Sequence, residues 1–213
     1  MPPQLTDGRL LRGERTRNAV LDAALMLASE RGLDGLSLGQ LAEQLGVSKS
    51  GLFAHWRSKE ELQLATIERA REQWTDAIVR PALKAPRGVR RLWALHERRM
   101  AFYAAQTLPG DCFFANTEFE FGVRPGPIRD RLVAALAEWL ALVQRLVAEA
   151  VVAGEIVDAV DPAQLAFEID AMGVASVMQS RLCDRATVHR HARAGVLSRL
   201  RALCTDPTLL PEA

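Results

Sequence analysis

Residues 37–59 constrain the fold of this chain more than any other segment, because their pattern predicts two short helices joined by a tight turn. A capping pattern predicts the first helix over about 38–45. Gly46 ends that helix, since glycine takes a positive φ at little steric cost. Ser48 is a favourable N-cap for a second helix over about 49–55. Such a pair predicts a helix-turn-helix, whose second helix can enter the major groove of DNA.

Two capping patterns and an apolar lining support this interpretation. Ser37 with Gln40, and Ser58 with Glu61, have the spacing of capping boxes. The second pair opens a long helix that we expect to run to about Leu83. The helices of the turn, with the first long helix as third member of the bundle, share an apolar lining that consists of Leu38, Leu41, Leu45, Val47, Leu52, Phe53 and Trp56.

Composition favours helices along the rest of the chain. Alanine and leucine, both strong helix formers, supply 63 of the 213 residues, and alternation of period two is hard to find. We therefore predict an all-α fold of about nine helices: an N-terminal helix-turn-helix domain followed by a C-terminal helical bundle. The expected helices span about 15–31, 38–45, 49–55, 59–83, 89–105, 112–121, 127–154, 162–183 and 187–204.

The expected domains follow from the same signals. Pro2, Pro3 and Gly8 predict a flexible arm over 1–12. The helix-turn-helix domain should then span 13–60, the helical bundle 61–205 and a polar tail 206–213.

The charge distribution points to a local rather than a global anion-binding surface. The net charge is only +1, but no acid lies between Gln44 and Lys59, where Lys49, Arg57 and His55 add cationic or titratable groups. The longest uncharged stretch has eleven residues, whereas a membrane span needs about 18. The N-terminus lacks the apolar core of a signal peptide. We therefore expect a cytoplasmic protein with no membrane contact.

Helix position indicates which residues of this segment would meet DNA. The front of the second short helix would face base edges, and it carries Ser48, Lys49, Ser50 and Gly51. Ser37, Ser58 and Lys59 lie at helix N-termini, where hydroxyls, backbone N–H groups and the helix dipole favour a phosphate.

The run from about Arg15 to Leu64 closely resembles the N-terminal domain of TetR-family transcriptional regulators. The resemblance rests on residues 41–49, LAEQLGVSK, and 58–62, SKEEL. In these segments the helix cap, the turn, the recognition helix and the start of the next helix all fall in register with the family pattern. It implies a homodimeric, usually repressing, DNA-binding protein whose C-terminal domain, residues 61–205 here, binds a small molecule and dimerises. By position, the family's DNA contacts would fall on Ser37, Ser48, Lys49, Ser50, Phe53, His55 and Lys59, with Gly51 allowing close approach.

Two positions depart from the family pattern. Phe53 stands where the family most often has tyrosine, and phenylalanine has no hydroxyl to offer a phosphate. Trp56 stands where phenylalanine is usual, and we assign it to the core. Arginines at positions 9, 12, 15 and 17 would allow the arm to enter a minor groove, although a solvated tail explains them too.

Aromatic residues recur through the C-terminal bundle, and as a group they fit a ligand cavity between helices, although core packing explains any one of them. The candidate ligand residues are Trp74, Trp93, Phe102, Tyr103, Phe113, Phe114, Phe119, Trp139 and Met178. They suggest an apolar or aromatic effector. Glu118, Glu120 and Asp130 lie near this group in sequence and either fix a cationic or hydroxylated effector or are solvated.

Two further features have alternative interpretations. Seven cations against one acid between Arg80 and Arg99 would attract DNA backbone or an anionic effector. Small and apolar residues on the penultimate helix would allow two helix pairs to approach in a dimer, or would pack within one chain. The candidate dimer residues are Phe167, Ala171, Val174, Ala175 and Met178.

Catalytic and metal-binding patterns are missing from the sequence. The nearest approach to G-x-S-x-G, residues 46–50, lacks the final glycine, and no dinucleotide or phosphate loop motif occurs. No two histidines are four residues apart, and Cys112, Cys183 and Cys204 form no C-x-x-C pair. We therefore expect no enzyme activity, no metal and no cofactor. The expected partners are double-stranded DNA with a palindromic site, a small effector and a second copy of the chain; the alternative is a helical scaffold without DNA binding.

Overall fold

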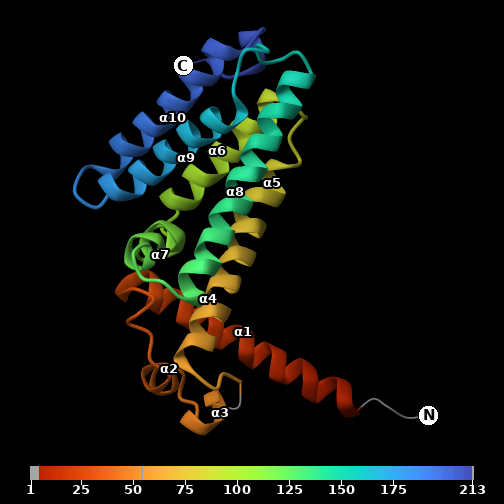
Figure 1. The fold of residues 1–213 in the computed structure, drawn as a ribbon. Helices are drawn as coiled ribbons and strands as arrows, with labels where there is room; N and C mark the ends of the chain where they lie inside the picture. The colour runs from red at the N-terminus through yellow and green to blue at the C-terminus, as the bar shows by residue number, and fades with distance from the viewer. Residues whose placement is uncertain (1–4, 54, 213) are drawn as a thin grey trace. The chain divides into compact units, whose positions relative to one another are not determined.

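The all-α prediction is confirmed. A computed structural model describes residues 5–53 and 55–212, with the side chains of residues 5–15, 49 and 51 outside that description, and within it the only β-type pairing is an isolated bridge between Ile156 and Cys204. Figure 1 shows the helices, which number close to the predicted nine: α1 (Leu5–Arg31), α2 (Leu38–Leu45), α3 (Lys49–Phe53), α4 (Lys59–Trp74), α5 (Arg80–Ala82), α6 (Val89–Ala104), α7 (Phe113–Phe121), α8 (Pro127–Val152), α9 (Pro162–Gln179) and α10 (Arg185–Leu203).

The chain divides into two compact units. The first comprises residues up to Arg71 together with 108–132, and the second comprises 72–107 together with 133–213. This division differs from the domain boundary expected after residue 60, because α7 and the start of α8 join the helix-turn-helix in the first unit.

The start of α1 differs from the prediction. The helix begins at Leu5 rather than near Arg15, so residues 5–12 of the expected flexible arm are helical. No proline follows Pro3 in this stretch, and Gly8 and Gly13 weaken a helix without ending it. The remaining arm residues, 1–4, lie outside the described part of the chain.

The core of the first unit forms on one face of α1. Its buried residues recur at helical spacing, and the buried side chains of α2, α3 and α4 belong to the same unit. Gly32 ends α1 with a φ of +88°, a conformation that favours glycine. The buried residues of α1 are Val20, Leu21, Ala24, Leu25, Leu27 and Ala28.

The long helix expected over 59–83 is continuous but changes its hydrogen-bond pattern. A π-helical turn, Thr75–Val79, joins α4 to α5, and the N–H of Arg80 donates to the carbonyl of Thr75. Pro81 has no N–H to donate to residue 77, so a wider turn accommodates it without breaking the helix.

In the second unit, α6, α9 and α10 pack against one another. Local sequence sets where α9 and α10 begin: Asp161 accepts a hydrogen bond from the N–H of Ala163, and Asp184 accepts one from the N–H of Thr187. None of the helices in the described residues is long and apolar enough to cross a bilayer.

His96 is a buried polar residue in the packed face of α6. It is only 1% exposed, and neither ring nitrogen meets hydrogen-bond geometry with a protein partner in the described residues. Burial lowers the pKa of His96 to about 3, and the nearby charges of Arg99 and Arg193 act in the same direction, while the Ala192 backbone offsets part of the shift. The imidazole is therefore neutral at physiological pH.

This burial predicts acid-sensitive stability. The pKa of His96 lies below that of an unfolded histidine, so the unfolded state binds the extra proton and stability falls as pH drops from about 6.5 toward 3. We expect wild-type protein to lose about 2 kcal/mol more than His96→Gln between pH 7 and pH 5, measured by urea unfolding. His191→Gln, at an exposed histidine of α10, controls for the loss of a surface imidazole. Equal losses in wild type and His96→Gln would contradict the prediction.

Candidate functional site

The turn between α2 and α3 has the geometry that the sequence predicts. Gly46 adopts φ 63° and ψ 27°, the left-handed conformation. Its N–H donates to the carbonyl of Glu43 at 3.2 Å, and the N–H of Val47 donates to the carbonyl of Ala42 at 3.0 Å. These bonds satisfy the free carbonyls of α2 and turn the chain sharply into α3.

One of the two predicted capping boxes is wrong. Ser37 has the extended backbone of an N-cap but makes no side-chain cap bond to α2. Ser58 does cap α4, since its Oγ accepts from the N–H of Glu61 at 3.1 Å. The carboxylate of Glu61 then accepts from the N–H of Arg57 at 2.6 Å, one residue before the position that a standard box uses.

Helix α3 has a buried face and an exposed face. Leu52 and, just after the helix, Trp56 are buried, and the guanidinium of Arg17 on α1 lies 5.7 Å from the Trp56 ring. Phe53 is 44% exposed and Val47 is 37% exposed, so these two do not belong to the predicted apolar lining. A five-residue helix can bury only one side, which explains the exposure of Phe53; Val47 lies in the turn before the helix.

Most of the predicted DNA-contact residues lie on the exposed side. Ser48, Ser50, His55 and Lys59 are exposed like Phe53, and Ser37 is half-buried. The hydroxyl of Ser50 donates to that of Ser48 at 3.2 Å. Lys49 and Gly51 are both in α3, but the exposure of these two residues lies outside the description.

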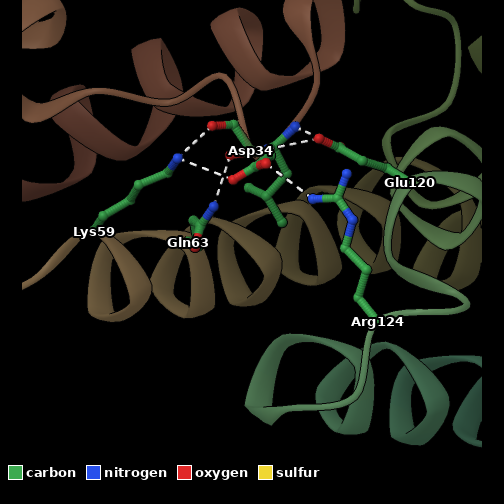
Figure 2. A network of polar contacts seen from close by, with 6 residues as sticks. Asp34, Lys59, Gln63, Glu120 and Arg124 are labelled. Atoms are coloured by element: carbon green, nitrogen blue, oxygen red, sulfur yellow. Dashed lines mark hydrogen bonds and ion pairs between the residues drawn. The ribbon is translucent and has the colours of Figure 1, made fainter.

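The sequence predicts Lys59 as a phosphate contact, but in the structure its ammonium group is already paired with an acid. Figure 2 shows its Nζ directed at Asp34, in the loop between α1 and α2. The Nζ lies 3.0 Å from Oδ1 of Asp34 and also donates to the Asp34 carbonyl. Arg124 binds the other carboxylate oxygen at 2.9 Å. No local sequence pattern indicates this pairing, because Asp34 lies 25 residues before Lys59.

Glu120 of α7 holds the same loop through its backbone. Its two carboxylate oxygens accept from the consecutive N–H groups of Leu33 and Asp34, each at 2.8 Å (Figure 2). Gln63 of α4 donates to the carbonyl of Leu33 at 2.9 Å. Of the two alternatives for Glu120, effector binding and solvation, the structure shows neither: the carboxylate binds this loop, a charge-assisted contact.

Four of the candidate ligand residues come together in the second unit. The Trp74 ring lies 5.3 Å from that of Trp139, 6.0 Å from that of Phe102 and 6.2 Å from that of Tyr103. These centroid distances are typical of packed aromatic pairs.

Arg99 occupies the middle of this aromatic cluster and was not among the candidate residues. Its guanidinium lies between 5.4 and 5.7 Å from the rings of Trp74, Tyr103 and Trp139. It donates to the Tyr103 hydroxyl at 2.8 Å and lies 3.0 Å from Asp170. Asp170 also accepts from the indole N–H of Trp139 at 2.8 Å. The buried charge is therefore paired and hydrogen-bonded, as burial requires.

The remaining candidate ligand residues do not join this cluster. Trp93 instead lies beside His96 and Arg193, and Phe113 and Phe114 contact each other in the first unit. Phe119 is 67% exposed, and Met178 lies on the exposed side of α9.

Four of the seven cations between Arg80 and Arg99 have acidic partners within the second unit. Arg80 pairs with Asp76 at 2.7 Å, Arg91 lies 3.6 Å from Glu149, and Arg90 lies 4.0 Å from Glu155. Arg99 is buried, whereas Lys84, Arg87 and Arg98 of the same stretch are exposed, so the surface expected to attract DNA or an anionic effector is reduced but still present.

The outer face of α9 carries the candidate dimer residues. Phe167 is 64% exposed, and Ala171, Ala175 and Met178 are also exposed at helical spacing, with Val174 half-buried beside them. On the opposite side of α9, Leu165, Ile169 and Val177 are buried. The helix thus shows an apolar stripe on both sides.

Comparison with known proteins identifies the family. The family model described as "Bacterial regulatory proteins, tetR family" matches residues 20–66, and that described as "Tetracyclin repressor-like, C-terminal domain" matches residues 88–196. The second match alone spans just over half of the chain. The protein belongs to the TetR family of bacterial regulators.

Individual relatives agree with this assignment. The tetracycline repressor protein class A from transposon 1721 of Escherichia coli is 47% identical over 51 residues, 24% of each chain. Matches to the curated relatives span about a quarter to a third of those proteins. A TetR transcriptional regulator from Chloroflexus aurantiacus has a TM-score of 0.80 at 26% identity over 91% of this chain and 98% of its own. The regulator AibR, solved in complex with isovaleryl coenzyme A and operator DNA, shares the fold, with a TM-score of 0.61 at 19% identity over 87% and 96% of the two chains.

The close approach of α9 to Arg99 predicts a stability effect. A Cβ added at Gly173 would lie 2.2 Å from Cζ of Arg99, so alanine there forces the buried guanidinium away from its partners. We expect Gly173→Ala to lower the free energy of unfolding by about 2–4 kcal/mol in urea titration.

Gly195→Ala on α10 is the matched control. Its added Cβ meets only the flexible end of Met172, at 2.9 Å. The better helix propensity of alanine should make this variant neutral or slightly more stable. Similar free energies of unfolding for the two variants would contradict the prediction, because they would show that residue 173 tolerates a Cβ beside Arg99.

Proposed function

We propose that this protein is a sequence-specific DNA-binding transcriptional repressor that acts as a homodimer on a palindromic operator. The observation that carries the proposal is the outer face of α3, which is exposed, contains no acid and lies on a buried support. Exposed hydroxyls of Ser48 and Ser50 suit base edges, which accept and donate hydrogen bonds in the major groove. Membership of the TetR family supports the same function.

The proposed dimer uses the outer face of α9. Exposed apolar residues that recur along one helix face favour burial against a partner. In a two-fold dimer the same face meets its own copy, and the small side chains of Ala171 and Ala175 would allow the helices to approach closely. Two-fold protein symmetry then predicts two operator half-sites related by inversion.

We further propose that a small apolar or aromatic effector releases the protein from DNA. The packed rings of Trp74, Phe102, Tyr103 and Trp139 supply apolar surface of the kind that lines ligand sites in helical bundles. An effector can shift the protein only if it binds the DNA-free arrangement more tightly than the DNA-bound one.

Selection of bound duplexes from a random DNA pool, at near-physiological salt, tests the DNA-binding proposal. We expect an inverted repeat, and the recovered duplex can then serve as the probe for effectors that release it. Ser50→Ala should reduce discrimination at one position of each half-site by up to tenfold, whereas Ser198→Ala, an exposed serine on α10, should not. Recovery of no motif by folded protein would favour the alternative, a helical scaffold without DNA binding.

Charge placed on the α9 face tests the dimer. We expect Phe167→Glu to convert the dimer to a monomer in sedimentation equilibrium at micromolar concentration, because the carboxylate would be buried against its own copy. Phe119→Glu is the matched control, since Phe119 is equally exposed but lies on α7 of the first unit. A dimer that survives Phe167→Glu would move the interface to another surface.

A further inference from the structure

Lys59 has an internal partner that any DNA phosphate would have to replace. Its Nζ contacts both a carboxylate oxygen and the backbone carbonyl of Asp34, and the side chains of Lys59 and Asp34 are about half exposed. A lysine ammonium is a compact charge with three donors, so the same three donors serve either the aspartate or a phosphate.

Asp34 itself is shared between two cations. Arg124, in the loop after α7, donates to Oδ2 at 2.9 Å while Lys59 binds Oδ1. The hydrogen bond from Lys59 lowers the pKa of Asp34, with that from Arg124 as the second cause, so the carboxylate is ionised at physiological pH. The competing charge is therefore present wherever the protein would meet DNA.

The loop that carries Asp34 is fixed in place, which makes the competition independent of loop motion. Glu120 binds the N–H groups of Leu33 and Asp34 from one side, and Gln63 binds the Leu33 carbonyl from another. Gly32 permits the close approach, since a Cβ there would lie 3.0 Å from the Glu120 carboxylate. Two consecutive N–H groups that converge on one carboxylate hold the backbone in a single arrangement.

We propose that Asp34 competes with the DNA phosphate for Lys59, and that Arg124 sets the strength of this competition. When Arg124 shares the carboxylate, Asp34 holds Lys59 less tightly and the lysine is more available to DNA. Arg124 lies within the segment matched by the C-terminal domain model, so a change in that segment would alter DNA affinity without any change in α3. The inference rests on the proposed DNA-binding function.

Exposed ion pairs of this kind exchange readily. Water screens them, and each contributes little to stability. A phosphate that takes Lys59 also releases condensed counterions from DNA, which favours the exchange at low salt. Asp34 should therefore weaken DNA binding by a modest factor and should not abolish it.

The test measures binding to a random-sequence duplex and to the selected operator duplex by fluorescence anisotropy between 50 and 300 mM salt. We expect Asp34→Asn to raise affinity for both duplexes about three- to fivefold. The same substitution in a Lys59→Met background should have no effect on affinity, because the ammonium group for which Asp34 and the phosphate compete is then absent. Asp22→Asn controls for net charge: Asp22 pairs with Arg69 in the same unit and is similarly exposed.

Arg124→Gln tests the role of Arg124, because its removal should let Asp34 hold Lys59 more tightly. It should lower affinity about two- to threefold beyond the effect of Arg129→Gln, a charge-matched control whose guanidinium binds the Gly122 carbonyl. The excess should vanish in the Lys59→Met background. A melting curve by circular dichroism establishes that each variant is folded.

The outcomes separate this inference from the function on which it rests. Wild-type protein that binds no duplex would overturn both. Wild-type binding with an unchanged Asp34→Asn variant, with equal gains for Asp34→Asn and Asp22→Asn, or with a gain that persists in Lys59→Met, would overturn the competition and leave DNA binding intact.

Discussion

The proposed DNA-contact surface, here called the reading surface, is the outer face of α3. It depends on the burial of Leu52 and Trp56 on the inner side of this helix. A helix of five residues is too short to form in water by itself. The conformational entropy lost in forming the first turn exceeds the free energy gained from so few hydrogen bonds. Its geometry must come from the side chains that it buries. Leu52 and Trp56 are almost fully buried, and Arg17 lies against the Trp56 ring. The exposed Ser50 of α3 is therefore positioned by the residues that the helix buries on its opposite side.

The loop before α2 gives the helix-turn-helix a second support of a different kind. Apolar packing fixes the depth of a helix but is non-directional, whereas hydrogen bonds to backbone N–H groups fix orientation. Glu120 and Gln63 supply such bonds at Leu33 and Asp34, from α7 and α4 respectively. The first unit therefore includes a segment more than 80 residues from the loop in sequence, and this explains why the chain does not divide after residue 60.

Local signals predicted the elements well, and long-range charge pairing escaped them. Gly46 and the pair Asp161-Pro162 determine helix ends through their own backbone chemistry, so the sequence alone located them. Arg99 looked like one of seven cations on a basic surface, yet it is buried among three rings with Asp170, which lies 71 residues further along. No spacing rule connects such residues, because only the packing of α6 against α9 brings them together. The DNA-contact residues remain predictions, although most of them are exposed as expected.

Pairing of the cations within the chain bears on how DNA affinity arises. Lys59 of the helix-turn-helix is paired with Asp34, and Arg80, Arg91 and Arg99 of the second unit also have acidic partners, so none of these four cations could bind a phosphate without giving up a carboxylate. The exposed hydroxyls of Ser48 and Ser50 are neutral, so as proposed base contacts they would discriminate between bases rather than add affinity. A single subunit would therefore bind DNA weakly. In the proposed dimer, the second reading surface binds at high effective concentration once the first is in place, which multiplies affinity without any new contact. The apolar face of α9 and the sparse charge of α3 are therefore consistent with each other: dimerisation would supply the affinity for DNA that a single reading surface lacks.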